Sequence, residues 1–292
     1  MLPQKSKELG SIGFVVLKDW MPNAENADFA VVQAARVSTG NGLKSPEEDR
    51  STLRYLYRKE HTSPFEMVEF KFHIKCPLFV ARQWLRHRTA NVNEASGRYS
   101  VIKDEFYIPT TEEIRQQGSH LDKQGSGGKA DYQKAQFFVS ELDRVCGEAY
   151  DLYESSIDKK SDDIPGVTRE QARMVLPVNV MTQFYWKIDL HNLLRFVRLR
   201  MDPHAQYEIQ VFAQAIYELI KEIVPETCQA FEDYTLNAIK LSKLDIDIIA
   251  AYNSKNISLI PNLLTKYGKS EKADLLKKLE LLGIQYDQSV FG

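Results

Sequence analysis

Residues 67–88 read MVEFKFHIKCPLFVARQWLRHR and predict a strand that leads directly into a helix. Apolar and polar side chains alternate over Met67–Ile74, which is the period of a strand with one buried face. Pro77 suits the first turn of a helix, and the residues after it predict a helix to about His87. The neighbouring segments extend this pattern to one α+β domain.

Further strands and helices flank this stretch on both sides. Strands are predicted at Ser11–Asp19 and at Val178–Ile188. Helices are predicted over Asn23–Val37, Pro46 to about Glu60, Tyr132–Ile157, Thr168–Leu176, His191–Leu199 and Ala205–Ile223. We therefore expect a domain over residues 1–235 and a helical C-terminal extension over residues 236–292, with breaks near Asn253 and Pro261. Residues 115–130 are rich in Gln, Gly, Ser and Lys and predict a flexible surface insertion.

The composition argues against several classes of protein. The chain has 292 residues, 43% of them hydrophobic, and a net charge of −2, so nothing attracts it as a whole to nucleic acid or to a membrane. Met1–Gly10 is polar and no apolar run could cross a bilayer, so we expect neither a signal peptide nor a membrane-spanning helix. Cys76, Cys146 and Cys228 are too widely spaced for a zinc site or a disulfide framework. We expect reduced thiols, no metal and a cytoplasmic location.

A dense group of polar side chains follows the helix predicted at Pro77. Arg86-His87-Arg88 lies where that helix should end, and Thr89–Gly97, which has no apolar periodicity, follows as a predicted irregular loop. Arginine forms paired, charge-assisted hydrogen bonds with phosphate, and Ser96 adds a neutral donor. Cations are also favoured at a helix C-terminus, and charge runs often only face water, so a solvated basic patch stays open as the alternative.

The spacing of these residues resembles the signature of the flavin-dependent thymidylate synthases, the ThyX family. The match consists of Arg86-His87-Arg88, a gap of seven residues and Ser96, with Asn93, Glu94, Arg98 and Tyr99 in register. Segments 34–38 (AARVS), 61–66 (HTSPFE), 170–177 (EQARMVLP), 189–200 (DLHNLLRFVRLR) and 204–209 (HAQYEI) are similar to further segments of that family. Asn91 and Asp189 depart from it, because relatives often have Ser and Asn there.

The resemblance implies the fold, the activity and the partners. The fold would be a mixed or antiparallel sheet with flanking helices and a helical bundle. The reaction would convert dUMP to dTMP with FAD as cofactor, 5,10-methylenetetrahydrofolate as carbon donor and NADPH as reductant. The family forms homotetramers whose active sites are shared between chains. No Gly-x-Gly-x-x-Gly follows a strand, so we expect FAD to be held without a Rossmann domain.

The resemblance also assigns site residues. Those implied to bind dUMP are Gln83, Trp84, Leu85, Arg86, Glu94, Ala95, Ser96, Gly97, Arg98, Arg173 and Arg200. Those implied to bind FAD are His61, Ser63, Arg86, His87, Arg88, Glu94, Asp189, Leu190, His191 and Arg195. Arg173 is similar to the arginine that reaches a nucleotide bound mainly by another subunit.

The implied chemistry does without a covalent nucleophile. Classical thymidylate synthases use a cysteine in the context Pro-Cys-His, and no cysteine here has that context. Cys76 precedes a proline at a strand exit and should be buried packing. Ser96 has no base beside it in the sequence, so we assign it to binding. Arg200 is then the catalytic residue, placed to stabilise negative charge on the uracil ring.

Three other functions stay open at this stage. A nucleic-acid-binding module built on Arg86-His87-Arg88 is disfavoured by the pI near 6.3. A flavoprotein oxidoreductase that no longer methylates would need motifs that the chain lacks. A non-catalytic relative is disfavoured because Arg86, Glu94, Ser96, Arg98, Arg173 and Arg200 are all present.

Overall fold

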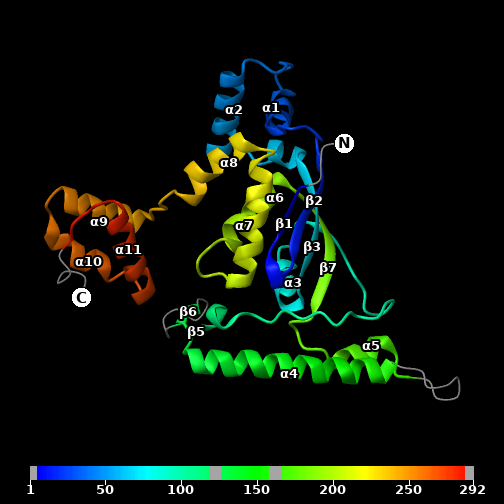
Figure 1. Ribbon diagram of the computed structural model, residues 1–292. Helices are drawn as coiled ribbons and strands as arrows, with labels where there is room; N and C mark the ends of the chain where they lie inside the picture. The colour runs from blue at the N-terminus through cyan, green and yellow to red at the C-terminus, as the bar shows by residue number, and fades with distance from the viewer. Residues whose placement is uncertain (1–4, 119–125, 158–165, 287–292) are drawn as a thin grey trace. The chain divides into compact units, whose positions relative to one another are not determined.

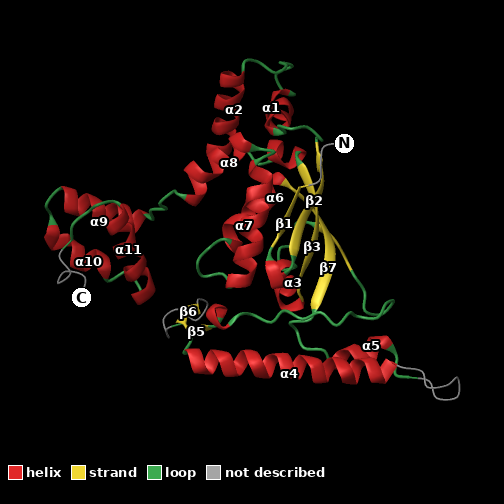
Figure 2. Ribbon diagram, in the orientation of Figure 1, coloured by secondary structure: helices red, strands yellow, loops and turns green. Residues whose placement is uncertain are grey.

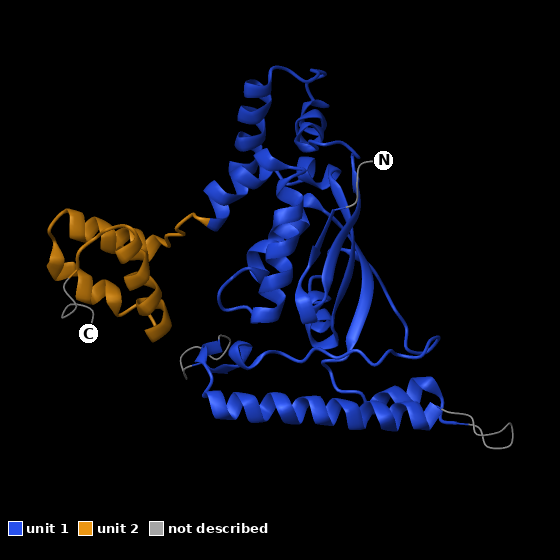
Figure 3. Ribbon diagram, in the orientation of Figure 1, with its two compact units in different colours: residues 1–236 blue, residues 237–292 orange. Residues whose placement is uncertain are grey.

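The computed structural model describes residues 5–118, 126–157 and 166–286 (Figure 1). The chain divides into two compact units, residues 1–236 and residues 237–292 (Figure 3). Each unit has its own hydrophobic core.

A five-stranded antiparallel sheet forms the centre of the first unit. Its strands, in spatial order, are β1 (Lys5–Glu8), β2 (Phe14–Met21), β3 (Glu69–Pro77), β7 (Met181–Asp189) and β4 (Asn91–Glu94). The alternation in residues 67–74 is confirmed, because Phe70, Phe72 and Ile74 of β3 have no exposed surface. Phe72 lies opposite Trp186 of β7, so the apolar face continues across the sheet.

Helices cover this apolar face (Figure 2). They are α3 (Leu78–Trp84), α6 (Leu190–Arg200) and α7 (Tyr207–Lys221). Trp84 packs against the rings of Phe184, Trp186, Phe196 and Phe212, with centroid separations of 4.9 to 5.7 Å. Large aromatic side chains buried together contribute much of the packing energy of a core, so the end of α3 is held firmly against the sheet and α6.

A second group of helices packs beside the first. It contains α1 (Asp28–Arg36), α2 (Pro46–Arg58), α8 (Pro225–Phe231), the 3₁₀ turn η2 (Ser63–Met67) and the π-helical turn η5 (Glu232–Leu236). The buried carboxylate of Asp28 accepts hydrogen bonds from the main-chain N of Glu226 and Thr227, at 2.8 and 3.0 Å. Asp28 thereby satisfies free amides in the first turn of α8 from another helix.

The rest of the first unit is built around α4 (Tyr132–Ile157). The elements α5 (Arg169–Ala172), η3 (Thr111–Glu113) and η4 (Arg173–Val175) pack against it. Strands β5 (Arg115–Gln117) and β6 (Ser126–Lys129) form a two-stranded antiparallel sheet within the predicted insertion at residues 115–130. Residues 119–125 of that insertion lie outside the described residues.

The second unit is helical. It contains α9 (Lys243–Asn253), η6 (Ile257–Leu259), α10 (Ile260–Leu264) and α11 (Lys269–Leu281). Its core consists of Ile248, Ala251, Ile260, Leu264, Leu275 and Leu279. The buried carboxylate of Asp245 accepts from Tyr267 Oη at 2.7 Å and from Lys278 Nζ at 3.0 Å, which joins α9 to the rest of the unit.

Several predicted boundaries were wrong. Part of the predicted irregular loop, Asn91–Glu94, is the edge strand β4, which pairs with β7 although its own side chains are polar. The strand β1 was not predicted, because its sequence KSKE has no apolar face. The helix predicted from Asn23 begins only at Asp28. The predicted breaks near Asn253 and Pro261 are confirmed, because α9 ends at Asn253 and α10 begins at Ile260, with Pro261 in its first turn, where the missing N–H of proline is tolerated. The other predicted elements are confirmed within a few residues.

Candidate functional site

Arg200, the last residue of α6, is fixed to the end of α3. Its Nη2 donates to the main-chain O of Gln83 at 3.0 Å, and the Gln83 side chain donates in turn to Gln206 Oε1. Gln83, Arg200 and Gln206 line a cavity of about 1150 Å³, called the first cavity below. Arg115 of β5 also lines it, and its guanidinium lies over the ring of Tyr207, 5.4 Å from the ring centroid.

The charge on Arg200 is only partly satisfied within the chain. Its Nε is buried and has no hydrogen-bond partner among the described residues. Burial, and then the nearby charge of Arg86, lower the pKa of Arg200. Burial, and then Arg195 and Arg200, lower the pKa of His87 in the same way. Crowded cations with an unused donor favour an anionic ligand at the end of α6.

Another part of the predicted nucleotide site lines a second cavity, of about 720 Å³. It is lined by Glu94, Ala95, Ser96, Gly97 and Arg173. Thr182 Oγ1 donates to Glu94 Oε1 at 2.7 Å and fixes that carboxylate. A Cβ atom on Gly97 would lie 2.7 Å from Ile102 Cδ1, so the absence of a side chain lets Ile102 approach this segment closely.

Arg98 and Arg173 both contact Glu170. Arg98 Nε donates to Glu170 Oε2 at 2.9 Å, and Glu170 itself lines this cavity. Arg173 Nε contacts the main-chain O of Glu170 at 3.4 Å. Within one chain Arg173 therefore groups with the segment 94–98, while Gln83 and Arg200 line the first cavity.

A third cavity, of about 380 Å³, brings together three residues predicted to bind FAD. These are His61, His191 and Arg195. His61 follows the C-terminus of α2, where Glu60 has a φ of 56° and the main-chain N of His61 donates to Leu56 O at 3.0 Å. This left-handed helix ending turns the chain so that His61 faces α6 across the cavity.

Other predicted residues have different positions. The side chains of Trp84 and Leu190 are fully buried in the core, so only their main chains could contact a ligand. Asp189 caps α6, because its carboxylate accepts from the main-chain N of Asn192 at 2.9 Å. The remaining predicted residues, which line none of the three cavities, are Ser63, Leu85, Arg86, His87, Arg88 and Arg98.

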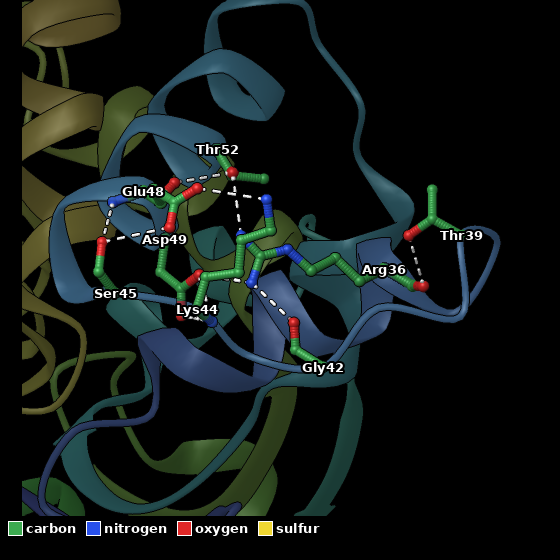
Figure 4. Close-up of polar contacts among 8 residues, drawn as sticks. All are labelled: Arg36, Thr39, Gly42, Lys44, Ser45, Glu48, Asp49 and Thr52. Carbon is green, nitrogen blue, oxygen red and sulfur yellow. Dashed lines mark hydrogen bonds and ion pairs between the residues drawn. The ribbon is translucent and has the colours of Figure 1, made fainter.

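In the segment 34–38 only Arg36 is buried, and its side chain contacts the protein itself. The buried guanidinium of Arg36 lies 2.5 Å from Asp49 Oδ1 and donates to Gly42 O at 3.0 Å (Figure 4). Thr39 Oγ1 donates to the main-chain O of Arg36 at 3.0 Å. Arg36 thus ties the loop between α1 and α2 to α2, and its guanidinium is occupied by these contacts.

The described residues contain no activated form of the nucleophile candidates. Cys76, Cys146 and Cys228 are free and buried, which confirms the expected packing role of Cys76. Burial raises the pKa of all three thiols, so the reactive thiolate is disfavoured. Ser96 Oγ accepts from the main-chain N of Arg98 at 3.3 Å, and no described His or carboxylate is hydrogen-bonded to it. In the described part of the chain, no three His, Cys, Asp or Glu side chains are grouped as metal ligands would be.

The motifs missed some residues that the fold brings to the cavities. Thr182 reaches the second cavity from β7, and Gln206 reaches the first from the start of α7. Arg58 and Arg198 line the third cavity. Glu170 and Gln206 lie within motif segments, which could have drawn attention to them. Arg198 also lies in a motif segment, 189–200, whereas nothing in the local sequence distinguishes Arg58 from a surface arginine.

Comparisons with known proteins identify the family of the chain. Residues 17–226 match the Thy1 family, described as thymidylate synthase complementing protein. A flavin-dependent thymidylate synthase of Dictyostelium discoideum is 51% identical over 241 residues, covering 81% of this chain and 77% of that protein. One of Thermus thermophilus is 51% identical over 234 residues, covering 80% of this chain and 81% of that protein.

A solved structure is similar as well. It is the UMP/dUMP methylase PolB of Streptomyces cacaoi bound with 5-Br dUMP, with a TM-score of 0.67 and 33% identity, covering 78% of this chain and 98% of that chain. Within residues 5–118, 126–157 and 166–286, no helix combines the length and the apolar character needed to cross a bilayer. The family match and the extent of these identities establish that the chain belongs to the flavin-dependent thymidylate synthase family.

Proposed function

We propose that the chain methylates dUMP to dTMP, with FAD as cofactor, 5,10-methylenetetrahydrofolate as carbon donor and NADPH as reductant. The observation that carries the proposal is Arg200, whose buried Nε has no partner among the described residues and whose neighbour Arg86 adds a second positive charge. A nucleotide that carries a phosphate and an acidic imide ring supplies the anion that this arrangement lacks. Relatives named flavin-dependent thymidylate synthase and the neighbour with 5-Br dUMP support this choice of substrate.

Arg200 is assigned to the uracil ring. The ring must become nucleophilic at C5, and this requires stabilisation of negative charge along its N3/O4 edge. A guanidinium fixed by the main-chain O of Gln83 is already oriented before the charge develops, so little reorganisation is needed. Arginine stays protonated at neutral pH, so Arg200 stabilises this charge and does not act as a general base. FAD supplies the redox chemistry when bound, and the residues of the chain orient its partners.

Covalent activation of the ring has little support. An attacking cysteine would need access to the ligand and a thiolate, and the three thiols are buried with raised pKa values. Ser96 would need a base to remove its proton. Polarisation of the ring by Arg200 is therefore the route that these residues support.

The nucleotide site is proposed to form between chains of a homotetramer. Gln83, Arg86 and Arg200 would hold the uracil side, while Ser96, Arg98 and Arg173 of another copy would hold the phosphate. This division follows from the separate first and second cavities within one chain. Two half-sites with complementary chemistry are the arrangement expected where symmetric copies complete one another's sites.

The remaining assignments are the residues that contact FAD and the location of the protein in the cell. His61, His191 and Arg195, which share the third cavity, are proposed to contact FAD. Asp189 and Leu190 are proposed to contribute through the main chain at the start of α6. The buried, unpaired cysteines support the expected cytoplasmic location, where thiols remain reduced.

The absorbance spectrum of the purified protein tests the proposal. We expect flavin bands that bleach on addition of NADPH under anaerobic conditions and that shift on addition of dUMP. Supplying 5,10-methylenetetrahydrofolate should then give dTMP, detected by mass spectrometry. A protein that binds no flavin after reconstitution, or that bleaches with NADPH and never yields dTMP, would contradict the proposed function.

A further inference from the structure

The third cavity holds more positive charge than the residues predicted to bind FAD account for. Arg58, the last residue of α2, and Arg198 of α6 line it together with His61, His191 and Arg195. The two helices lie far apart in the sequence, yet both contribute side chains to this cavity. Among the described residues that line the cavity, Glu60 is the single carboxylate.

The arginines of this cavity differ from their neighbours in having no ion-pair partner. Arg50 and Arg54 of α2 pair with Glu226 at 2.8 Å and with Asp233 at 2.7 Å. Arg58, Arg195 and Arg198 make no salt bridge to any acid of the described residues. Like charges gathered in a concave site repel one another, and an anionic ligand would remove that repulsion.

An aromatic wall faces these cations. It consists of Tyr57, Phe65, Phe231 and Tyr234. Tyr57 is fixed by a hydrogen bond of 2.9 Å between its hydroxyl and Thr235 Oγ1. Tyr234 and Thr235 belong to the π-helical turn η5, and such turns occur often at functional sites because they redirect side chains. Cations beside aromatic rings suit a ligand that joins an aromatic ring to an oxyanion.

We propose that Arg58 and Arg198 bind the phosphate groups of a dinucleotide, either the pyrophosphate of FAD or the phosphates of NADPH. The planar guanidinium pairs with two phosphate oxygens at once, and two arginines on separate helices can hold two phosphate groups. The cavity of about 380 Å³ is at the lower end of the range for small-molecule sites, so it holds part of a dinucleotide. This inference rests on the proposed function, which supplies both dinucleotides.

Binding measurements on the full-length protein test the inference. In flavin-free protein, FAD and riboflavin are titrated by fluorescence against wild type, Arg58→Ala and Arg198→Ala. In flavin-loaded protein, the NADPH concentration that half-saturates the rate of flavin bleaching is measured without dUMP or folate. A charge-assisted hydrogen bond accounts for about a 10- to 100-fold change in affinity, so one dinucleotide should bind more weakly by that factor.

The flavin titration and the NADPH titration each identify one source of the phosphate groups. A loss confined to FAD, with riboflavin affinity unchanged, assigns the arginines to the flavin pyrophosphate. A loss confined to NADPH, with FAD affinity unchanged, assigns them to the reductant. Arg58→Lys and Arg198→Lys keep the charge and should recover part of the affinity. Arg50→Ala is the matched control on the same helix, because Arg50 is already paired with Glu226.

Two outcomes would overturn the inference. One is dinucleotide affinities within twofold of wild type in both alanine variants. The other is an equal loss of affinity for riboflavin, which has no phosphate. A wild-type protein that binds neither dinucleotide would instead contradict the proposed function, so the two failures are distinguishable.

Discussion

Arg200 Nη2 donates a hydrogen bond of 3.0 Å to the main-chain O of Gln83, which couples the end of α6 to the end of α3. The buried Nε of Arg200 has no partner among the described residues. One part of the guanidinium is therefore used for positioning, and the rest remains for a ligand. Substitutions can therefore test separately the positive charge of Arg200 and the planar geometry of its guanidinium.

Arg200→Ala should retain FAD and lose most dTMP formation. Removing one preorganised donor from a site of developing negative charge lowers kcat by about 10²- to 10³-fold. Arg200→Lys keeps a positive charge without the planar fork and should recover only part of the rate. The rate of dTMP formation and the flavin absorbance are measured together. Arg144→Ala, on the exposed face of α4, is the control, and near-normal turnover in Arg200→Ala would exclude the assigned role.

Mixing inactive variants should reveal whether sites are shared. Because Arg200 and Arg173 line different cavities of one chain, Arg200→Ala and Arg173→Ala chains should complement one another. If copies mix at random, about a quarter of the sites combine two intact halves. Activity is measured after verified subunit exchange. A mixture of Arg98→Ala and Arg173→Ala is the control and should stay inactive, because Glu170 contacts both residues. If the mixture of Arg200→Ala and Arg173→Ala chains stays inactive, active sites formed within single chains are favoured instead.

The sequence predicts the elements whose own side chains determine their structure. Phe70, Phe72 and Ile74 alternate because the sheet buries one face of β3, and this pattern is visible without any partner. Asn91–Glu94 becomes a strand only because β7 offers free main-chain groups beside it. Such pairing depends on distant residues, so polar edge strands are poorly predicted from local sequence.

The same limit applies to the candidate site. The motif around Arg86 identified side chains suited to a nucleotide, but their grouping into three cavities depends on where α3, α6 and β4 lie in the fold. Trp84 shares that motif and is instead fully buried among aromatic rings. Only the structure distinguishes Arg58 and Arg198, which form no ion pair among the described residues. Arg50 and Arg54, in contrast, are both paired with acids.

Replacing the three cysteines should leave catalysis intact. Cys76, Cys146 and Cys228 are buried and their raised pKa values disfavour the thiolate, so none is placed to attack a ligand. We expect the triple Cys→Ala variant, if folded, to keep kcat within about twofold, with stability reduced by the lost packing. Circular dichroism establishes folding and the dTMP assay gives kcat. Loss of activity in a folded variant would argue for covalent catalysis after all.

Gly97→Ala should weaken nucleotide binding without removing the flavin. The added Cβ would lie 2.7 Å from Ile102 Cδ1 and 3.5 Å from Arg173 Cδ, so the wall of the second cavity has to move. We expect the KM for dUMP to rise by about 10-fold, since small displacements of positioning groups are costly. Gly147→Ala is the matched control, because a Cβ there meets nothing within 4 Å. Equal KM values in the two variants would show that the close approach of Gly97 to Ile102 is unimportant for binding.

Asp28→Asn should change how stability depends on pH. Burial raises the pKa of Asp28 from 3.8 to about 6, although hydrogen bonds from Thr227 and Glu226 oppose the shift. Between these two values the folded chain holds a proton that the unfolded chain has lost. This group's contribution to the free energy of unfolding is therefore largest below about pH 4 and falls by about 3 kcal/mol as the pH rises through 6.

Asn at position 28 does not titrate, so the contribution of this proton is absent from the variant. The free energy of unfolding of wild type minus that of Asp28→Asn should decrease between pH 4 and pH 7. Denaturant unfolding at several pH values in this range measures the difference directly. A difference that increases with pH would mean that the carboxylate is more stable in the folded chain than in water. The hydrogen bonds to the first turn of α8 would then outweigh the desolvation of Asp28.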